Sequence, residues 1–415
     1  MTKIRPVILG LICAVALSSH AIGAVGQVGT CLSGVTKLGP SIQNAVNALP
    51  PNSTLDVCPG IYLEQVIVTQ PITIRGVKDP NSTADAAVIA APSGGIVANT
   101  TSLTSGNPIA AQLLMDAPGG SVNINNITVD GGNNQISGCA PNLIGIYYRN
   151  ASGTVSQVAA INQALSVSLN GCQSGLGIFV QSGNSLTSTV TVKNSYVANY
   201  QKNGITGNEA GTTLTSSSNT VFGQGPTTGA AENGIQFGFG AAGSANSNTV
   251  MDNVYSPGTA AAAGILVFSS ANISVASNTV GNSQLGISFD SDPTFGPADN
   301  GTITFNKVSA THLFDGVDVC SNSNNVHNNT IIGSDESAFH LDSACGSTGN
   351  NNTVANNAIN DSCAGILEDP GTTNTVGSNV FHNVTNAIGS GPTCTNPPRG
   401  QHGKKQVATP KPVRP

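Results

Sequence analysis

A two-residue step, glycine or alanine followed by a large apolar residue, recurs along most of the chain. The steps are Gly145-Ile146, Gly177-Ile178, Gly204-Ile205, Gly234-Ile235, Gly264-Ile265, Gly286-Ile287, Gly316-Val317, Ala338-Phe339, Gly365-Ile366 and Ala387-Ile388. Successive steps are 22 to 32 residues apart, and the shortest spacing occurs three times. Such a repeat is typical of a solenoid, in which each coil buries its apolar face against its neighbours. The shortest spacing therefore indicates a bare coil, and the longer ones indicate coils that carry a loop.

Short segments of alternating polarity accompany this step. Further apolar steps follow an asparagine, at Asn219-Thr220-Val221, Asn248-Thr249-Val250, Asn278-Thr279-Val280, Asn329-Thr330-Ile331 and Asn352-Thr353-Val354. Segments of this kind are typical of short β-strands. We expect glycine and asparagine at the corners, because tight bends often need left-handed backbone angles, and we expect stacked asparagines to hydrogen-bond between coils. The predicted fold class is all-β, a single-stranded right-handed parallel β-helix.

The N-terminal residues have the layout of an export signal. Lys3 and Arg5 precede an apolar run over residues 7–17 and then small residues, so residues 1–23 are predicted to be a signal peptide. The apolar run is too short to span a bilayer. We therefore expect a secreted or periplasmic protein without a membrane span.

The start of the mature chain carries a device that closes the open end of a β-helix. A capping helix is predicted over residues 41–49, with Ser41 as its N-cap and Pro50-Pro51 ending it. Its apolar residues fall on one helical face, which can cover the first coil. We expect the β-helix to occupy residues 24–394, followed by a disordered, basic, Pro-rich tail over residues 395–415.

Eight cysteines follow the predicted signal peptide, and an even number in an exported chain indicates disulfides. Stacked coils bring Cα atoms about 4.8 Å apart, which is within the usual disulfide range. We expect Cys31–Cys58 and Cys139–Cys172 to pair. For the last four cysteines several pairings stay open, and the preferred one is Cys320–Cys345 with Cys363–Cys394.

Charge is sparse, since only 8% of the residues are Asp, Glu, Lys or Arg, and the formal net charge is −6. Leaving out the two cations of the signal peptide gives −8, and leaving out the five cations of the tail gives −13 for the body. An acidic body disfavours nucleic acid as a partner. The hydrophobic content of 39% is sufficient for a packed core.

Three N-terminal segments carry a resemblance to a known superfamily. Residues 41–46, 59–64 and 71–76 resemble the opening of pectin methylesterases and other pectate-lyase-like β-helices. Residues 122–131 are similar to a coil of that superfamily, and the later Asn-rich coils resemble the PbH1 repeats of NosD-type periplasmic proteins. The resemblance covers roughly residues 30–394 and implies the fold. It implies no single activity, because these residues build coils and do not perform chemistry. The sequence motifs of pectin methylesterases, polygalacturonases and alginate epimerases are absent.

An acidic face in the later coils is the candidate for chemistry. If the large apolar residue of each step points inward, the first and third residues after it point outward. These outward residues include Asp290, Asp318, His340 and Asp342, with Asp369 one coil further on. Asp290 and Asp318 would lie about 8 Å apart at the backbone, which suits an inverting pair of carboxyl groups.

We therefore predict a catalytic site of Asp290, Asp318, His340 and Asp342. Crowded carboxylates raise the pKa of one member, so Asp318 or Asp342 is the expected acid and Asp290 the expected base. His340 would orient the substrate or shuttle a proton. Two alternatives stay open: ordinary solvated residues on an outer face, or calcium held by Asp290, Asp292 and Asp318. No other cofactor is expected.

A sugar-binding platform is predicted from Tyr147, Arg149 and Phe179 on earlier coils, with simple coverage of a loop as the alternative.

The sequence predicts a secreted monomer that recognises an extracellular polysaccharide or cell-envelope glycan. Cleavage by a glycosidase or lyase mechanism is the enzymatic hypothesis, and a non-catalytic adhesion or structural β-helix is the alternative. A NosD-like accessory role in a copper pathway ranks lowest, because copper favours Met and His clusters. The mature chain has only Met115 and Met251, and its histidines are scattered.

Overall fold

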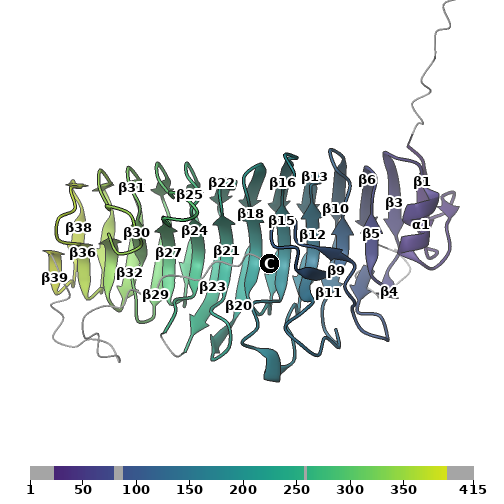
Figure 1. The fold of residues 1–415 in the computed structure, drawn as a ribbon, viewed down its shortest axis with the longest axis horizontal. Coiled ribbons are helices and arrows are strands. Elements are labelled where there is room, and N and C mark those ends of the chain that lie inside the picture. Colours follow the sequence, from purple (N-terminus) through teal and green to yellow (C-terminus); the bar gives the residue numbers. More distant parts are fainter. Residues whose placement is uncertain (1–22, 79–86, 257–258, 390–415) are drawn as a thin grey trace, which may run out of the picture.

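The computed structural model describes residues 23–78, 87–256 and 259–389. Over these residues the chain is a right-handed parallel β-helix, whose three long sheets run side by side along the molecule (Figure 1). This confirms the predicted fold class. The predicted signal peptide up to residue 22 and the predicted tail lie outside the described residues. Among the residues that are described, no helix has the length and apolar character needed to cross a membrane.

Each coil adds one strand to each sheet. Sheet A has 14 strands, from β2 (Thr36–Lys37) to β37 (Thr375–Val376), and sheet B has 12, from β4 (Gly60–Leu63) to β38 (Val380–His382). Sheet C has 13 strands, of which β8 (Thr100–Thr101) pairs antiparallel with its neighbour. The parallel strands of sheet C are β5 (Val66–Val68), β9 (Pro108–Met115), β12 (Asn142–Arg149), β15 (Leu176–Gln181), β18 (Asn203–Asn208), β21 (Asn233–Gly238), β24 (Ala263–Phe268), β27 (Leu285–Asp290), β30 (Val317–Cys320), β33 (Ser337–Leu341), β36 (Ala364–Glu368) and β39 (Asn386–Gly389).

The recurring apolar step forms the inner row of sheet C. Ile265 and Ile287, for example, are completely buried in the core that runs through the coils. The glycine before each does not have the left-handed angle expected of a corner. A Cβ atom at Gly264 would lie 2.8 Å from the carbonyl oxygen of Gly286 and 2.3 Å from Val280. Close stacking of coils, and not a bend, therefore requires glycine here.

Left-handed angles occur at many asparagines and at other glycines, as expected of corners, for example Asn282 with φ 48° and Gly240 with φ 88°. They also occur at residues that precede a ladder of stacked asparagines, such as Ser277 with φ 58°. The backbone N–H and the side-chain amide of Asn248 both donate to Oδ1 of Asn278, at 2.9 Å. The same pattern runs through Asn219, Asn248, Asn278, Asn306, Asn329, Asn357 and Asn379. The expected hydrogen bonding between stacked asparagines is confirmed. Asn352 belongs to a second ladder, between Asn324 and Asn374.

The predicted capping helix is present as α1 (Ile42–Ala48), with Ser41 as its N-cap. Its buried residues are Ile42, Ala45 and Val46, which cover the first coil as expected. The carboxylate of Glu64 accepts hydrogen bonds from the Ser41 hydroxyl and the Ile42 backbone N–H, at 2.9 and 2.8 Å. This negative charge satisfies the free N–H groups of the helix start.

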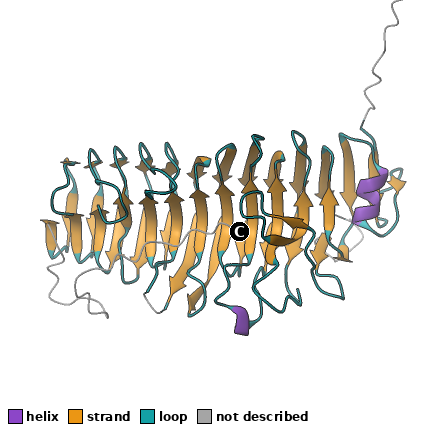
Figure 2. Cartoon of the chain, in the orientation of Figure 1, coloured by secondary structure: helices purple, strands orange, loops and turns teal. Residues whose placement is uncertain are grey.

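Loop length is uneven around the coils. Figure 2 shows short turns along the upper edge and longer loops along the lower edge, one of which contains the 3₁₀ helix η1 (Val167–Leu169). Asp290 and Asp318 lie on β27 and β30, which belong to the later coils (Figure 1). Asp342 follows β33, one coil further on.

Candidate active site

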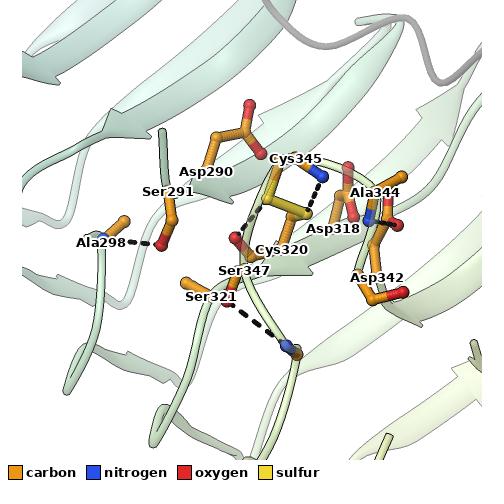
Figure 3. Close-up of a disulfide and its surroundings, with 12 residues drawn as sticks. Asp290, Ser291, Ala298, Asp318, Cys320, Ser321, Asp342, Ala344, Cys345 and Ser347 are labelled. Carbon is orange, nitrogen blue, oxygen red and sulfur yellow. Dashed lines mark hydrogen bonds between the residues drawn. A yellow bond between two sulfur atoms is a disulfide. The ribbon is translucent and has the colours of Figure 1, made fainter. Parts of the chain in front are cut away.

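The predicted site residues lie on adjacent strands of sheet C. Asp318 of β30 pairs with His340 of β33, and Asp290 at the end of β27 pairs with Cys320, two residues after Asp318. Asp342 follows β33 directly. Figure 3 shows Asp290, Asp318 and Asp342 gathered around Cys320. Because Asp290 and Asp318 are one coil and two residues apart, their backbones are about 8 Å from each other.

These side chains are buried, which contradicts the alternative that they are ordinary solvated residues. The exposed fractions are 0% for Asp342, 1% for Asp290 and His340, and 5% for Asp318. The turn after β33 meets the turn after β27, where Gly346 approaches Pro293. The disulfide Cys320–Cys345 fastens the first of these turns to sheet C (Figure 3).

Two further carboxylates, Asp315 and Asp369, complete the cluster around His340. The distance from Nδ1 of His340 is 3.4 Å to Asp315 Oδ2 and 3.8 Å to Asp318 Oδ1. On the other side of the ring, Nε2 of His340 lies 3.3 Å from Asp369 Oδ1. Strand alternation places Asp369 on this face. It gives no signal for Asp315, which lies in the turn before β30.

Burial and crowding shift the pKa values of the cluster. Burial raises the pKa of Asp290 to about 7, with a further rise from nearby Asp342 and an opposing effect of the Ser288 hydroxyl. Burial and Asp342 also raise the pKa of Asp318 well above its ordinary value. The two carboxyl groups of the diagonal pair are therefore both easier to protonate than a solvated aspartate.

At His340, burial and the neighbouring carboxylates shift the pKa in opposite directions. Burial lowers the pKa of His340, but the charges and hydrogen bonds of Asp315 and Asp369 outweigh burial and raise it well above the ordinary histidine value. The hydrogen bond from His340 in turn lowers the pKa of Asp369. An imidazolium held between carboxylates results.

Hydrogen bonding leaves three oxygens of the cluster unused. Asp290 Oδ2, Asp318 Oδ1 and Asp342 Oδ2 are buried and have no hydrogen-bond partner among the described residues. The other oxygen of Asp290 accepts from the Ser288 hydroxyl at 2.9 Å. A buried carboxylate oxygen without a donor is costly, so each of these three is poised for a proton, a cation or a substrate hydroxyl.

Asp290, Asp292 and Asp318, the expected calcium ligands, do not form one of the described groups whose potential ligand atoms come together. Asp292 Oδ1 accepts the backbone N–H groups of Thr294 and Phe295, at 2.7 and 3.1 Å, so it caps its own turn. Within the described residues, two groups bring potential ligand atoms within 4.8 Å of one another. They are Asp315, Asp318 and His340, and His340, Asp342 and Asp369.

The predicted sugar-binding platform is wrong, because its aromatic side chains are not exposed to solvent. Tyr147 and Phe179 are completely buried and stack on each other, with ring centroids 5.0 Å apart. The phenol of Tyr147 donates to Gln181 at 2.7 Å, and Arg149 lies 3.2 Å from Asp116. Strand β8 and the segment after it cover this part of sheet C, where the backbone N–H of Leu103 donates to Gln181. The alternative, aromatic residues under a loop, describes these side chains correctly.

Disulfides join the cysteines that stacking favours. Cys31–Cys58, Cys139–Cys172 and Cys320–Cys345 are bonded, with Cα–Cα distances of 5.7, 5.1 and 6.0 Å. Cys363 is also in a disulfide. The partner expected for it, Cys394, lies outside the described residues.

Comparison with known proteins supports the same fold. Residues 225–396 match the family described as periplasmic copper-binding protein (NosD). The later coils are thus similar to those of NosD proteins. No match was found among curated proteins.

Solved structures with the same fold include carbohydrate-active enzymes. The GH136 lacto-N-biosidase from Eubacterium ramulus has 11% identity and a TM-score of 0.55, over 86% of this chain and 68% of that one. The catalytic unit of the GH87 α-1,3-glucanase from Streptomyces thermodiastaticus has 15% identity and a TM-score of 0.52, over 85% of this chain and 65% of that one. At these identities the likeness shows the fold alone.

The donor atoms do not fit a copper centre of the soft type that the NosD description suggests. All described cysteines are in disulfides, so none offers a thiolate. Met115 is completely buried in the core, and each group of potential ligands contains a single histidine. Cu(I) favours thiolate, thioether and imidazole ligands, whereas these groups consist mainly of hard carboxylates.

Proposed function

We propose that this protein is an extracytoplasmic, carboxylate-dependent glycoside hydrolase acting on a polysaccharide or cell-envelope glycan. The observation that carries the proposal is the diagonal pair Asp290 and Asp318, two buried carboxyl groups with raised pKa values on adjacent strands of sheet C. Carbohydrate-active enzymes of the same fold support it as an analogy. Three disulfides between described cysteines, together with the bonded Cys363, also suit an oxidising compartment.

In this mechanism Asp318 is the general acid. Its pKa lies well above the ordinary value, so it keeps a proton that it can donate to the leaving glycosidic oxygen. Asp290 is the general base, since its pKa of about 7 leaves a large ionised fraction in neutral solution. It accepts the proton of a water that attacks the opposite face of the sugar. The two backbones are about 8 Å apart. We expect the carboxyl groups to leave room for that water, which gives inversion of the anomeric centre.

His340 positions Asp318 in this scheme. Its imidazolium lies 3.8 Å from Asp318 Oδ1 and is itself held by Asp315. Because the pair is buried, the turns after β27 and β33 have to move apart before a glycan reaches it. Asp369, whose side chain is 26% exposed, lies at the accessible side of the cluster.

The test is a screen of the mature protein against neutral and acidic glycans, including α-1,3-glucan, with reducing ends as the readout. Asp290→Asn and Asp318→Asn should each lower the rate by a factor of about 10² to 10⁴, as expected for loss of a general base or acid. Asp361→Asn is the matched control, because Asp361 is exposed and its side chain bonds only to Asn383 among the described contacts. Equal activity in all three variants would place the chemistry elsewhere.

The second candidate is a non-catalytic β-helix that binds glycans or stiffens the cell envelope. The nearly complete burial of the carboxylates favours it, since a permanently closed cluster would only be structural. A screen without any product, together with glycan binding that ignores the Asp290 and Asp318 substitutions, would support this alternative.

A further inference from the structure

A second feature of the cluster lies beside the diagonal pair. Asp342 Oδ2 is buried without a hydrogen-bond partner among the described residues, and Asp342 is completely inaccessible. Ligand atoms of His340, Asp342 and Asp369 lie within 4.8 Å of one another. Without a bound ion, a hydrogen bond between the Asp342 and Asp369 carboxyl groups and the charge of His340 relieve the crowding of these carboxyl groups. A divalent cation can replace both, because it neutralises the two carboxylates directly.

Hydrogen bonds from one turn hold one oxygen of each carboxylate. Asp342 Oδ1 accepts the backbone N–H of Ala344 at 2.8 Å. Asp369 Oδ2 accepts the backbone N–H and the hydroxyl of Ser343, at 3.1 and 3.0 Å. Asp369 Oδ1 lies 3.3 Å from Nε2 of His340. The turn that Cys345 fastens to sheet C thus orients both carboxylates.

The second ring nitrogen of His340, Nδ1, has a carboxylate partner, as is common for histidines that bind a metal. Nδ1 lies 3.4 Å from Asp315 Oδ2, while Nε2 lies 3.3 Å from Asp369 Oδ1. Metal-ligating imidazoles usually donate their second N–H to a carboxylate, which fixes the ring and makes the ligating nitrogen more basic. Asp315 in turn accepts from the backbone N–H of Ser337 at 3.0 Å.

We propose that His340 Nε2, Asp342 Oδ2 and Asp369 Oδ1 form a site for one divalent metal ion of borderline hardness, such as Zn²⁺ or Mn²⁺. One imidazole and two carboxylates suit these ions. Ca²⁺ prefers oxygen ligands alone and Cu⁺ prefers sulfur, so both should bind more weakly. The partly exposed Asp369 gives the ion a path from solvent. The ion would replace the proton on Nε2 of His340, while Nδ1 keeps its contact with Asp315. The site thus shares His340 with the proposed catalytic scheme, but its occupancy does not depend on hydrolysis.

Calorimetric titration of Zn²⁺ into the chelator-treated mature chain tests this site. We expect one equivalent of Zn²⁺ per chain, and at least a tenfold weaker affinity in Asp369→Asn. Asp361→Asn, an exposed aspartate in the same coils, should bind like the parent protein. The site is overturned if Zn²⁺ and Mn²⁺ show no saturable binding, or if Asp369→Asn and His340→Gln keep the parent stoichiometry and affinity.

A second readout guards against misfolded variants. Zn²⁺ should raise the melting temperature of the parent and of Asp361→Asn, because an ion that binds only the folded state stabilises it. Zn²⁺ should not change the melting temperature of Asp369→Asn or of His340→Gln, and cooperative unfolding shows that these variants are folded. Tight binding of Ca²⁺ with no response to Zn²⁺ would contradict the proposed ion class.

Discussion

At the scale of single residues, the raised pKa of Asp290 makes stability depend on pH. Its folded value of about 7 lies above the ordinary 3.8, so the folded state binds the proton more tightly than the unfolded state. The stabilisation is complete below about pH 4 and is lost as pH rises through 7, at a cost of about 4 kcal/mol at most. Asp290→Asn, which cannot ionise, should show a smaller fall in melting temperature between pH 5 and 8 than the parent. Asp361→Asn should keep the parent slope, and an unchanged slope in Asp290→Asn would contradict the shift.

The same residues show how far sequence reasoning reaches. Alternation along a strand predicts that Asp290, Asp318 and His340 share one face of sheet C, because side chains in a strand have a period of two. It cannot predict their burial, which follows from a contact between two turns, Gly346 with Pro293, that has no periodic signal. Turn residues such as Asp315 are missed for the same reason.

At the scale of elements, the turn after β33 is held by the disulfide Cys320–Cys345, which closes a loop of 25 residues. Replacing both cysteines by serine should lower the free energy of unfolding by about 3 kcal/mol and weaken Zn²⁺ binding, since Ser343 and Ala344 would no longer be held beside their carboxylates. Denaturant titration and calorimetry measure the two effects. The matched variant lacks Cys31–Cys58, near the N-terminal cap, with a similar separation of 27 residues. It should lose stability but keep Zn²⁺ affinity, and equal affinity in both variants would contradict this role of the turn.

At this scale the sequence was informative wherever a local signal sufficed. Ser41 and the apolar face behind it predicted α1, and stacking distances predicted the bonded cysteines. Tyr147 and Phe179 were misjudged because β8 folds back over them, a long-range pairing that their own strands do not encode.

At the scale of the whole molecule, the asparagine ladder joins successive coils into one column. Asn278 accepts two hydrogen bonds from Asn248 and donates to Ala245 and Asn306. Asn278→Ala should therefore cost about 2–4 kcal/mol, because it leaves buried donors and an acceptor without partners. Asn325→Ala, an exposed asparagine on sheet A, should cost less than about 0.5 kcal/mol. Denaturant unfolding distinguishes them, and equal effects would show that the ladder adds nothing to stability.

The repeat predicted this architecture because its large apolar residues form the buried inner row of successive coils. It did not predict the reason for the repeated glycines, since the clash of a Cβ at Gly264 with the next coil depends on stacking distance and not on a local bend.

The central claim, that Asp290 and Asp318 form an inverting acid–base pair, is tested most directly by the anomeric configuration of the first product. Proton NMR during cleavage of the glycan found by the screen would record it before mutarotation. We expect the inverted anomer, formed by the parent and by Asp361→Asn and lost in Asp290→Asn and Asp318→Asn. A retained anomer, or product that survives both substitutions, would contradict the assignment of this pair.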